Sequence, residues 1–288
     1  MGELSLTVPI KHSKRPRLRV GRVATYAFLV LVSVAMLLPF AWMASASLQV
    51  DKDVFRFPFQ WFPKNPQWQN YKLIWEKVPF LTFILNTSKL TVIITGLQLL
   101  TSSLAAYAFA RLDFKGRDVL FLAYIGTIAI PWQVYMVPQF IMMRKMGLSD
   151  THLALILMQA FTAFGVFLLR QFFIGIPREI SEAARIDGLS EYGIYARIIL
   201  PLSKPVLATL TIFSFVSVWN DFMGPLIYIS SEKLKTIQLG LRMFISQYSA
   251  DYSLIMAASL VSLLPVMLLF IFLQRFFIEG VASSGVKG

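Results

Sequence analysis

The sequence contains no cysteine and only two histidines, His12 and His152. The absence of cysteine excludes disulfides, thiolate catalysis and metal sites built on cysteine. Two histidines so far apart are too few for a zinc site built on histidine, so we expect no metal site. No paired-carboxylate, histidine or cysteine constellation of an enzyme active site is visible either. The sequence therefore argues against bond chemistry carried out by this chain.

A phosphate-binding loop of the Gly-x-x-x-x-Gly-Lys-Ser/Thr type is also missing, which excludes a nucleotide-hydrolysing subunit. Acidic residues are scarce, with 15 Asp and Glu against 27 Lys and Arg. The formal charge of +12 could suggest a nucleic-acid partner. However, the basic residues are dispersed, and no groove of aromatic and basic residues is visible. We therefore expect no nucleic-acid partner.

Long apolar runs are what the sequence has in abundance. Hydrophobic residues make up 57% of the chain and the mean hydropathy is +0.65, far above the usual apolar share of a soluble domain. These runs predict an all-α membrane protein with six transmembrane helices. We expect the spans at residues 23–48, 80–110, 119–143, 153–173, 206–229 and 253–276. Pro131 and Pro138 are expected to kink the third span.

The first apolar run has an alternative interpretation. A basic start, the run itself and Ala44-Ser45-Ala46 together mimic a secretory signal peptide with its cleavage site. The apolar core of a signal peptide is only about 7–15 residues long. Because residues 23–48 are well beyond that length, we favour a retained first span.

Six spans place both chain ends on one side of the membrane. That side carries more of the Lys and Arg, so we expect both termini in the cytoplasm. The expected organisation is a basic cytoplasmic tail over residues 1–22, a transmembrane domain over 23–277 and a cytoplasmic tail over 278–288. Only Asp221 places a carboxylate deep in a span, whereas ion-coupled carriers usually need several such groups.

A polar segment between the fourth and fifth apolar runs has helix boundaries of its own. It contains Glu182-Ala183-Ala184-Arg185-Ile186-Asp187-Gly188 and, nine residues later, Ile198-Ile199-Leu200-Pro201. Pro177 suits a first helical position, Gly188 can end a helix in the left-handed conformation, and Ser190 can cap a second helix. Pro201 and Pro205 prevent a smooth continuation into the next run. The segment predicts two short helices joined by a glycine hinge, docked against a partner.

This spacing resembles the cytoplasmic signature loop of the permease subunits of binding-protein-dependent ABC importers. The residues that carry the resemblance are Glu182, Ala183, Ala184, Gly188, Ile198, Leu200 and Pro201. The resemblance implies the type I ABC importer permease fold, in which the loop, here residues 177–201, forms coupling helices in a groove of the ATPase. It also implies that Glu182 meets basic groups of the ATPase, while Ala183, Ala184 and Gly188 allow close packing. The Ile198-x-Leu200-Pro201 end would anchor the second helix on the spans.

Two further segments carry weaker signals. The ending Gly285-Val286-Lys287-Gly288 resembles that of the smaller permease subunit of maltose-type carbohydrate importers, which implies a tail that reaches between two ATPase subunits. Trp219-Asn220-Asp221 is a polar cluster within the fifth predicted span. It could line a path for a polyol solute or bond to a partner permease. The external residues 230–252 could face a binding protein or form a plain connector.

The resemblance implies a subunit of an ATP-driven importer of a sugar or oligosaccharide, in a bacterial or archaeal cytoplasmic membrane. Its partners would be a second permease, two ATPase subunits and an extracytoplasmic binding protein. ATP and Mg would be bound by the ATPase subunits, so this chain would need no cofactor and would not be an enzyme. The alternatives are a permease for another solute, such as a polyol phosphate, and an ion-coupled secondary carrier.

Overall fold

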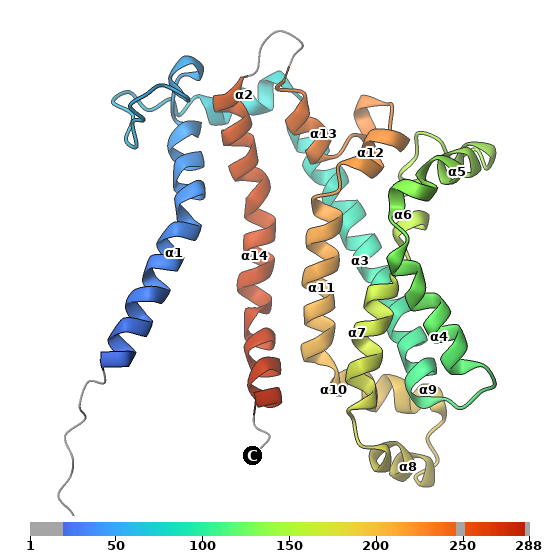
Figure 1. Cartoon of the computed structure of the whole chain (residues 1–288). Coiled ribbons are helices and arrows are strands. Elements are labelled where there is room, and N and C mark those ends of the chain that lie inside the picture. Colours follow the sequence, from blue (N-terminus) through green and yellow to red (C-terminus); the bar gives the residue numbers. More distant parts are fainter. Residues whose placement is uncertain (1–19, 246–250, 286–288) are drawn as a thin grey trace, which may run out of the picture.

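The computed structural model describes residues 20–245 and 251–285, with side chains described for 21–245 and 251–276. Within these ranges all regular elements are helices (Figure 1), so the predicted all-α class is confirmed. The longest are α1 (Val20–Ser47), α3 (Phe80–Arg111) and α14 (Tyr252–Gly285). The others are α2 (Asn70–Lys77), α4 (Arg117–Gly126), α5 (Trp132–Lys145), α6 (His152–Gln159), α7 (Ala163–Ile174), α8 (Arg178–Ile186), α9 (Glu191–Ile194), α10 (Leu200–Leu202), α11 (Lys204–Trp219), α12 (Met223–Tyr228) and α13 (Ile237–Arg242). Short 3-10 turns occupy Asp51–Asp53 (η1), Thr127–Ala129 (η2) and Glu232–Leu234 (η4), and a π-helical turn occupies Tyr195–Ile199 (η3).

Four segments are long and apolar enough to cross a membrane on their own. They are α1, α3, α14 and the stretch His152–Ile174, which contains α6 and α7. Two bent pairs raise the number to six if each pair makes one crossing: residues 117–145 and residues 191–219. The helices thus agree with the predicted spans in number and order, although two of the spans are broken.

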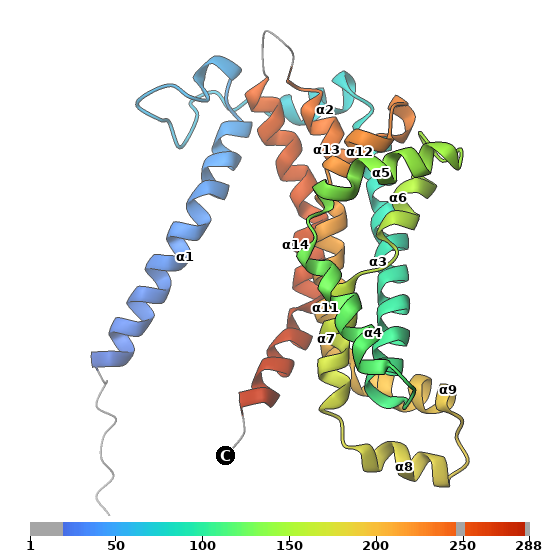
Figure 2. The same cartoon turned by 45° about the vertical axis from the view of Figure 1, so that its right-hand side comes forward.

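The third predicted span, residues 119–143, is not a single kinked helix. α4 ends at Gly126 and continues as η2, which ends at Ala129. After a bend of 98°, α5 starts at Trp132. Pro131 lies at the break with extended backbone, which is typical of a residue that has no N–H to donate to a helix. Pro138 lies inside α5 without ending it. As a result, α5 lies across one end of the bundle (Figures 1 and 2).

The fifth predicted span, residues 206–229, is interrupted as well. α11 ends at Trp219 and α12 starts at Met223. Asn220 Nδ2 donates to the Val216 carbonyl at 2.9 Å, and the Gly224 N–H donates to Asp221 Oδ1 at 3.0 Å. Such side-chain bonds to the backbone compete with the hydrogen bonds of a continuing helix. The prediction of one helix that contains Asp221 was therefore wrong.

α3 is the element around which the rest of the core is built. Three clusters of buried residues hold the bundle together, and α3 contributes to each of them. Phe80 and Phe83 belong to the cluster with α2, α13 and α14. Leu90 and Ile94 belong to the cluster with α6 and α12, and Tyr107 to the cluster with α7, α8 and α9.

α1 lies beside α14 at one end of the molecule and diverges from it at the other (Figures 1 and 2). Its side chains are apolar and mostly exposed, among them Tyr26, Leu31 and Met36. A helix that is apolar all round is typical of a membrane span. α1 thus has the length and the apolar surface of a membrane span.

The two ends of the bundle carry different elements. α8 and α9 lie at one end, together with the start of α1 and the end of α14 (Figure 1). α2, α5, α12 and α13 lie at the opposite end. The polar segment that resembles a coupling loop is thus on the same side as both described chain ends.

Candidate coupling loop and polar hollow

The coupling loop, residues 177–201, begins with α8, whose end is fixed by glycine. Gly188 has a φ of +82°, a left-handed conformation that side-chain-bearing residues rarely adopt. The Gly188 N–H donates to the Arg185 carbonyl and the Leu189 N–H to the Ala184 carbonyl, both at 3.0 Å. This pair of bonds is the Schellman motif, which satisfies carbonyls that a helix end leaves free. The predicted glycine hinge is therefore present, although Pro177 precedes α8 instead of occupying its first position.

The second helix of the loop starts as predicted at Ser190. Its Oγ accepts a hydrogen bond from the Gly193 N–H at 3.3 Å, which caps α9. The chain then continues through the π-helical turn and α10 and bends by 78° into α11. Ile198 and Leu200 pack against the core formed by α3, α7 and α11, whereas Pro201 is exposed. The predicted anchoring of this helix on the bundle thus holds for Ile198 and Leu200.

α8 has one face packed on the bundle and one face free of it. Ser181 and Ala184 are buried, and Ala184 belongs to the core cluster with Ile194 and Leu169. The opposite face consists of Glu179, Glu182, Ala183 and Ile186. These residues are at positions i, i+3, i+4 and i+7, so they form one stripe along the helix. Ile186 is 88% exposed. Of the two alanines expected to allow close packing by a partner, only Ala183 lies on this exposed face.

Ile186 and Tyr192 are exposed apolar residues of the loop that our sequence analysis did not select. Tyr192 is 74% exposed and lies in α9. A single exposed apolar residue is unremarkable in general. Two on one short loop that also carries Glu182 and Ala183 extend the surface available to a partner. The sequence signal for Ile186 was its position seven residues after Glu179, which places both on one face of α8.

Trp219, Asn220 and Asp221 lie in three different environments. Trp219 is 1% exposed, and its Nε1 donates to the Ser262 carbonyl of α14 at 3.0 Å. Asn220 is exposed and receives a bond from Gln238 Nε2 at 3.3 Å. Asp221 Oδ2 accepts from Gln159 Nε2 at 2.9 Å. Only Asp221 faces the hollow described next.

A polar hollow of about 400 Å³ lies between α3, α5, α6 and the break before α12. The residues that line it are Gln98, Trp132, Gln133, Tyr135, Gln139, Met158, Gln159, Phe161, Thr162, Ser217, Asp221, Met223 and Gly224. Four of them are glutamines from three helices, and one is a carboxylate. The lining thus combines amide donors and acceptors with aromatic rings, a combination suited to a solute rich in hydroxyl groups.

The bend at Pro131 directs α5 toward this hollow, and α5 contributes four of the lining residues. Within α5, Trp132 Nε1 donates to Gln139 Oε1 at 2.8 Å, with both residues in the lining. On the other side, Gln98 Nε2 donates to the Gln159 carbonyl at 2.7 Å. The glutamines were missed from the sequence because they are spread over three separate apolar runs. No spacing rule joins residues that only the tertiary fold brings together.

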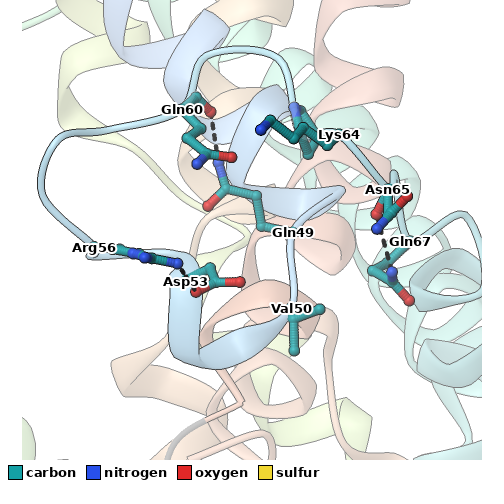
Figure 3. A pocket seen from close by; sticks show the side chains of 9 residues that line it. Gln49, Val50, Asp53, Arg56, Gln60, Lys64, Asn65 and Gln67 are labelled. Carbon is teal, nitrogen blue, oxygen red and sulfur yellow. Dashed lines mark hydrogen bonds and ion pairs between the residues drawn. The ribbon is translucent and has the colours of Figure 1, made fainter.

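A second, smaller hollow of about 170 Å³ lies in the connection between α1 and α2 (Figure 3). Gln49 is buried and donates through Nε2 to the Gln60 carbonyl at 2.8 Å. Asp53 pairs loosely with Arg56 at 3.6 Å on the rim. Asn70 Nδ2 donates to the Ser47 carbonyl at 2.9 Å and thereby ties α2 to the end of α1. These bonds hold an irregular connection between α1 and α2 in place.

Comparison with known proteins identifies the family. The profile of the family described as "Binding-protein-dependent transport system inner membrane component" matches residues 98–282, which include the coupling loop and most of the hollow. The permease protein AraQ of the arabinooligosaccharides transport system of Bacillus subtilis is 32% identical over 97% of this chain and 100% of its own length. AraQ of Halalkalibacterium halodurans is 39% identical over 73% of this chain and 75% of its own length.

A solved structure shares the fold. It is a crystal structure of a bacterial ABC transporter involved in the import of the acidic polysaccharide alginate. The similarity covers 93% of this chain and 100% of the other, with a TM-score of 0.79 and 23% identity. These findings confirm the importer permease resemblance predicted from the signature loop. The chain therefore belongs to the family of inner membrane components of binding-protein-dependent transport systems.

Proposed function

We propose that this chain is a permease subunit of an ATP-driven importer, which forms a translocation path for a sugar or oligosaccharide together with a second permease. The observation that carries the proposal is the loop 177–201, docked by Ala184 on its own bundle while Glu182, Ala183 and Ile186 remain exposed. A helix held rigidly on one side and open on the other suits a groove in a separate subunit. We assign that groove to an ATPase.

The proposed assembly contains this chain, a second permease, two ATPase subunits that bind ATP and Mg, and an extracytoplasmic binding protein. We place the loop and both termini in the cytoplasm of a bacterial or archaeal cell. The excess of Lys and Arg on that side supports this orientation. The common position of α8, the start of α1 and the end of α14 is consistent with it (Figure 1).

The carboxyl end is part of the proposal as well. We propose that Gly285, Val286, Lys287 and Gly288 reach the ATPase pair, as in the smaller permease of maltose-type importers. Val286, Lys287 and Gly288 lie outside the described residues, and only the backbone of Gly285, the last residue of α14, is described. The position of the α14 end beside the coupling loop side of the bundle supports this assignment (Figure 1).

The chemistry of the hollow favours a neutral hydroxylated solute. Amides of Gln98, Gln133 and Gln139 can donate and accept at once, as paired hydroxyl groups require. Asp221 already accepts hydrogen bonds within the chain, from Gly224 and Gln159, so it serves both the fold and the lining. The relatives named for arabinooligosaccharides and the structure named for alginate support a carbohydrate.

The same lining weighs against the two rival functions. Among the described residues that form the hollow none is Lys or Arg, the side chains that recognise a phosphate. A polyol phosphate is therefore a poorer fit than a sugar. Asp221 is the one carboxylate of this lining, whereas ion-coupled carriers use several such groups.

Reconstitution tests the proposal. The chain is purified from cells that express the neighbouring transport genes, inserted into lipid vesicles with the subunits that accompany it, and supplied with labelled arabino-oligosaccharides and malto-oligosaccharides. We expect uptake that requires ATP and a binding protein and is unchanged by ionophores. Uptake by the chain alone, driven by a proton or sodium gradient, would instead establish the secondary carrier.

A further inference from the structure

α3 is an uninterrupted connection between the two ends of the molecule (Figures 1 and 2). It is a single helix of 32 residues and contains no proline, whereas α1 contains Pro39 and α14 contains Pro265. The path His152–Ile174 is divided into α6 and α7, and the two remaining paths are bent, by 98° in α4–α5 and by 78° before α11. Because a continuous helix without proline resists bending, α3 is the stiffest route through the bundle.

One end of α3 holds the external segment that follows α12. Asn86 Nδ2 donates to the carbonyls of Lys233 and Lys235 at 2.8 and 3.0 Å. At the next residue, Thr87 Oγ1 accepts from the Ile237 N–H at 2.8 Å in a buried position. Gly240 of α13 approaches Phe83 so closely that an added Cβ would stand 2.4 Å from the ring. The segment from η4 to α13 is thus held on α3 by hydrogen bonds between side chains of α3 and the backbone of the segment, and by close packing.

The other end of α3 holds the coupling loop. The Tyr107 hydroxyl donates to Glu191 Oε2 at 2.6 Å, and Arg185 Nε donates to Glu191 Oε1 at 2.7 Å. One carboxylate therefore joins the end of α8, the start of α9 and the span α3. The Tyr107 ring lies edge-on to the Tyr195 ring at 5.3 Å, and the Tyr195 hydroxyl bonds to Ser103 at 2.8 Å.

A third contact closes the entry to the loop. Arg111 Nη2 donates to the carbonyls of Phe173 and Ile176 at 2.6 Å each. Those carbonyls lie at the end of α7 and directly before α8, where a helix end leaves acceptors free. α3 consequently holds the coupling loop where it begins and again where its second helix starts.

From these contacts we infer that α3 is a strut that transmits displacement between the coupling loop and the external segment 232–240, with Tyr107 and Asn86 as its positioning residues. The two side chains are 21 positions apart, which is about 32 Å along a helix. Coupling over such a distance needs an element whose position is affected by both sites. A stiff helix that is hydrogen-bonded at each end meets that requirement. The inference rests on the proposed function, since it assumes that ATP acts on the α8 side.

A spin label on the external segment tests the strut. Because the chain lacks cysteine, Glu232→Cys provides a single labelling position on an exposed external residue. The labelled chain is assembled in lipid nanodiscs with its partner permease and with ATPase subunits made free of cysteine. The spectrum of the label is recorded with and without a non-hydrolysable ATP analogue, and ATP hydrolysis and complex assembly are measured on the same samples.

We expect the analogue to shift the population of label environments in the parent. Tyr107→Phe keeps the ring but removes the hydroxyl, and Asn86→Ala removes the amide. Tyr107→Phe should reduce the shift about fivefold, the effect of one lost hydrogen bond on a two-state equilibrium. Asn86→Ala removes two hydrogen bonds and should reduce the shift at least as much. Tyr26→Phe, at an exposed residue near the start of α1, and Asn65→Ala remove a hydroxyl and an amide from the same two ends without touching α3, and they should leave the shift unchanged. Glu191→Gln, which alters the other partner of the Tyr107 bond, should behave like Tyr107→Phe.

The outcomes separate the two claims. A parent that shows no response to the analogue would contradict the proposed function and the strut together. A parental response retained in full by Tyr107→Phe, Glu191→Gln and Asn86→Ala, in assembled complexes, would overturn the strut alone. If Tyr107→Phe does not assemble, the spectra of Glu191→Gln and Asn86→Ala decide the question.

Discussion

At the scale of single residues, backbone conformation and hydrogen bonding give some positions an importance that residue type alone does not reveal. Gly188 has open space around its Cβ position, and only its φ of +82° restricts what can replace it. Asp150 has a φ of +56° and bonds to a distant external segment. At each position a pair of substitutions can be compared that differ in one property. That property is the tolerated backbone conformation at Gly188 and the titratable charge at Asp150.

Replacing Gly188 with valine should uncouple ATP hydrolysis from uptake while leaving membrane insertion intact. A β-branched residue is strained in the left-handed region, at a cost of about 1–2 kcal/mol, so the Schellman end of α8 should open. Gly188→Asn is the matched control, because asparagine tolerates this conformation. The measurement is the ratio of solute transported to ATP hydrolysed in vesicles. Equal ratios for the valine and asparagine variants would contradict the role assigned to this backbone conformation.

Asp150 should make the external end sensitive to acid. Bonds from the Ser231 hydroxyl and from the N–H groups of Ser231 and Ser230 hold the pKa of the Asp150 carboxyl below its ordinary value. A lowered pKa in the folded state means that this stabilisation is present above the ordinary carboxyl pKa of about 3.9 and is lost as the pH falls through the folded value. Thermal unfolding in detergent should show the loss.

The matched variants for that measurement are Asp150→Asn and Glu232→Gln. Asparagine keeps the left-handed backbone and one acceptor but does not titrate, so its melting temperature should fall less between about pH 5 and pH 3 than that of the parent. Glu232→Gln removes an exposed carboxylate from the same external segment and should follow the parent curve. Identical curves for all three proteins would show that the bonds of Asp150 do not contribute.

At the scale of elements, the loop 177–201 was predictable because its signals are local. Gly188, Ser190 and Pro205 each act on the backbone within a few residues, and the structure has a helix end, a cap and a bend where they predicted them. The break at Asn220 and Asp221 was not predictable from apolar length, because it depends on side chains that bond to nearby backbone groups. The direction taken by α5 after Pro131 depends on packing that no single run encodes.

The two alanines of α8 should respond differently to the same enlargement. Ala184→Leu inserts three carbon atoms into the packed cluster with Ile194 and should destabilise the chain by about 1–3 kcal/mol. Ala183→Leu lies on the exposed face, so it should leave the melting temperature unchanged but weaken retention of the ATPase during purification. Equal melting temperatures with equal retention would mean that α8 is not seated as described.

At the scale of the whole molecule, the fold class and the family followed from hydropathy and the signature loop, whereas the hollow did not. Gln98, Gln133 and Gln159 come from three helices that converge only after the chain has folded. The apolar segments were predicted in the right order. Their arrangement around the hollow depends on how the helices pack together, which cannot be predicted from each apolar run separately.

Labelling of intact cells should place the two ends of the bundle on opposite sides of the membrane. In the cysteine-free chain, a membrane-impermeant maleimide should modify Glu232→Cys from outside and leave Ser190→Cys unmodified. Both positions should react once the membrane is permeabilised, which serves as the control for access. Modification of Ser190→Cys in intact cells would reverse the proposed orientation.

The amide lining of the hollow has a consequence for energetics. Glutamine side chains carry no charge and do not titrate, so a solute held by them would gain or lose little affinity when pH or ionic strength changes. Apart from Asp221, whose carboxylate already accepts bonds from Gln159 and Gly224, the lining has no charge that a proton or a sodium ion could neutralise to trigger release. The solute would be released only when the helices that line the hollow move apart. The direction of transport would then depend on work done by a separate ATPase.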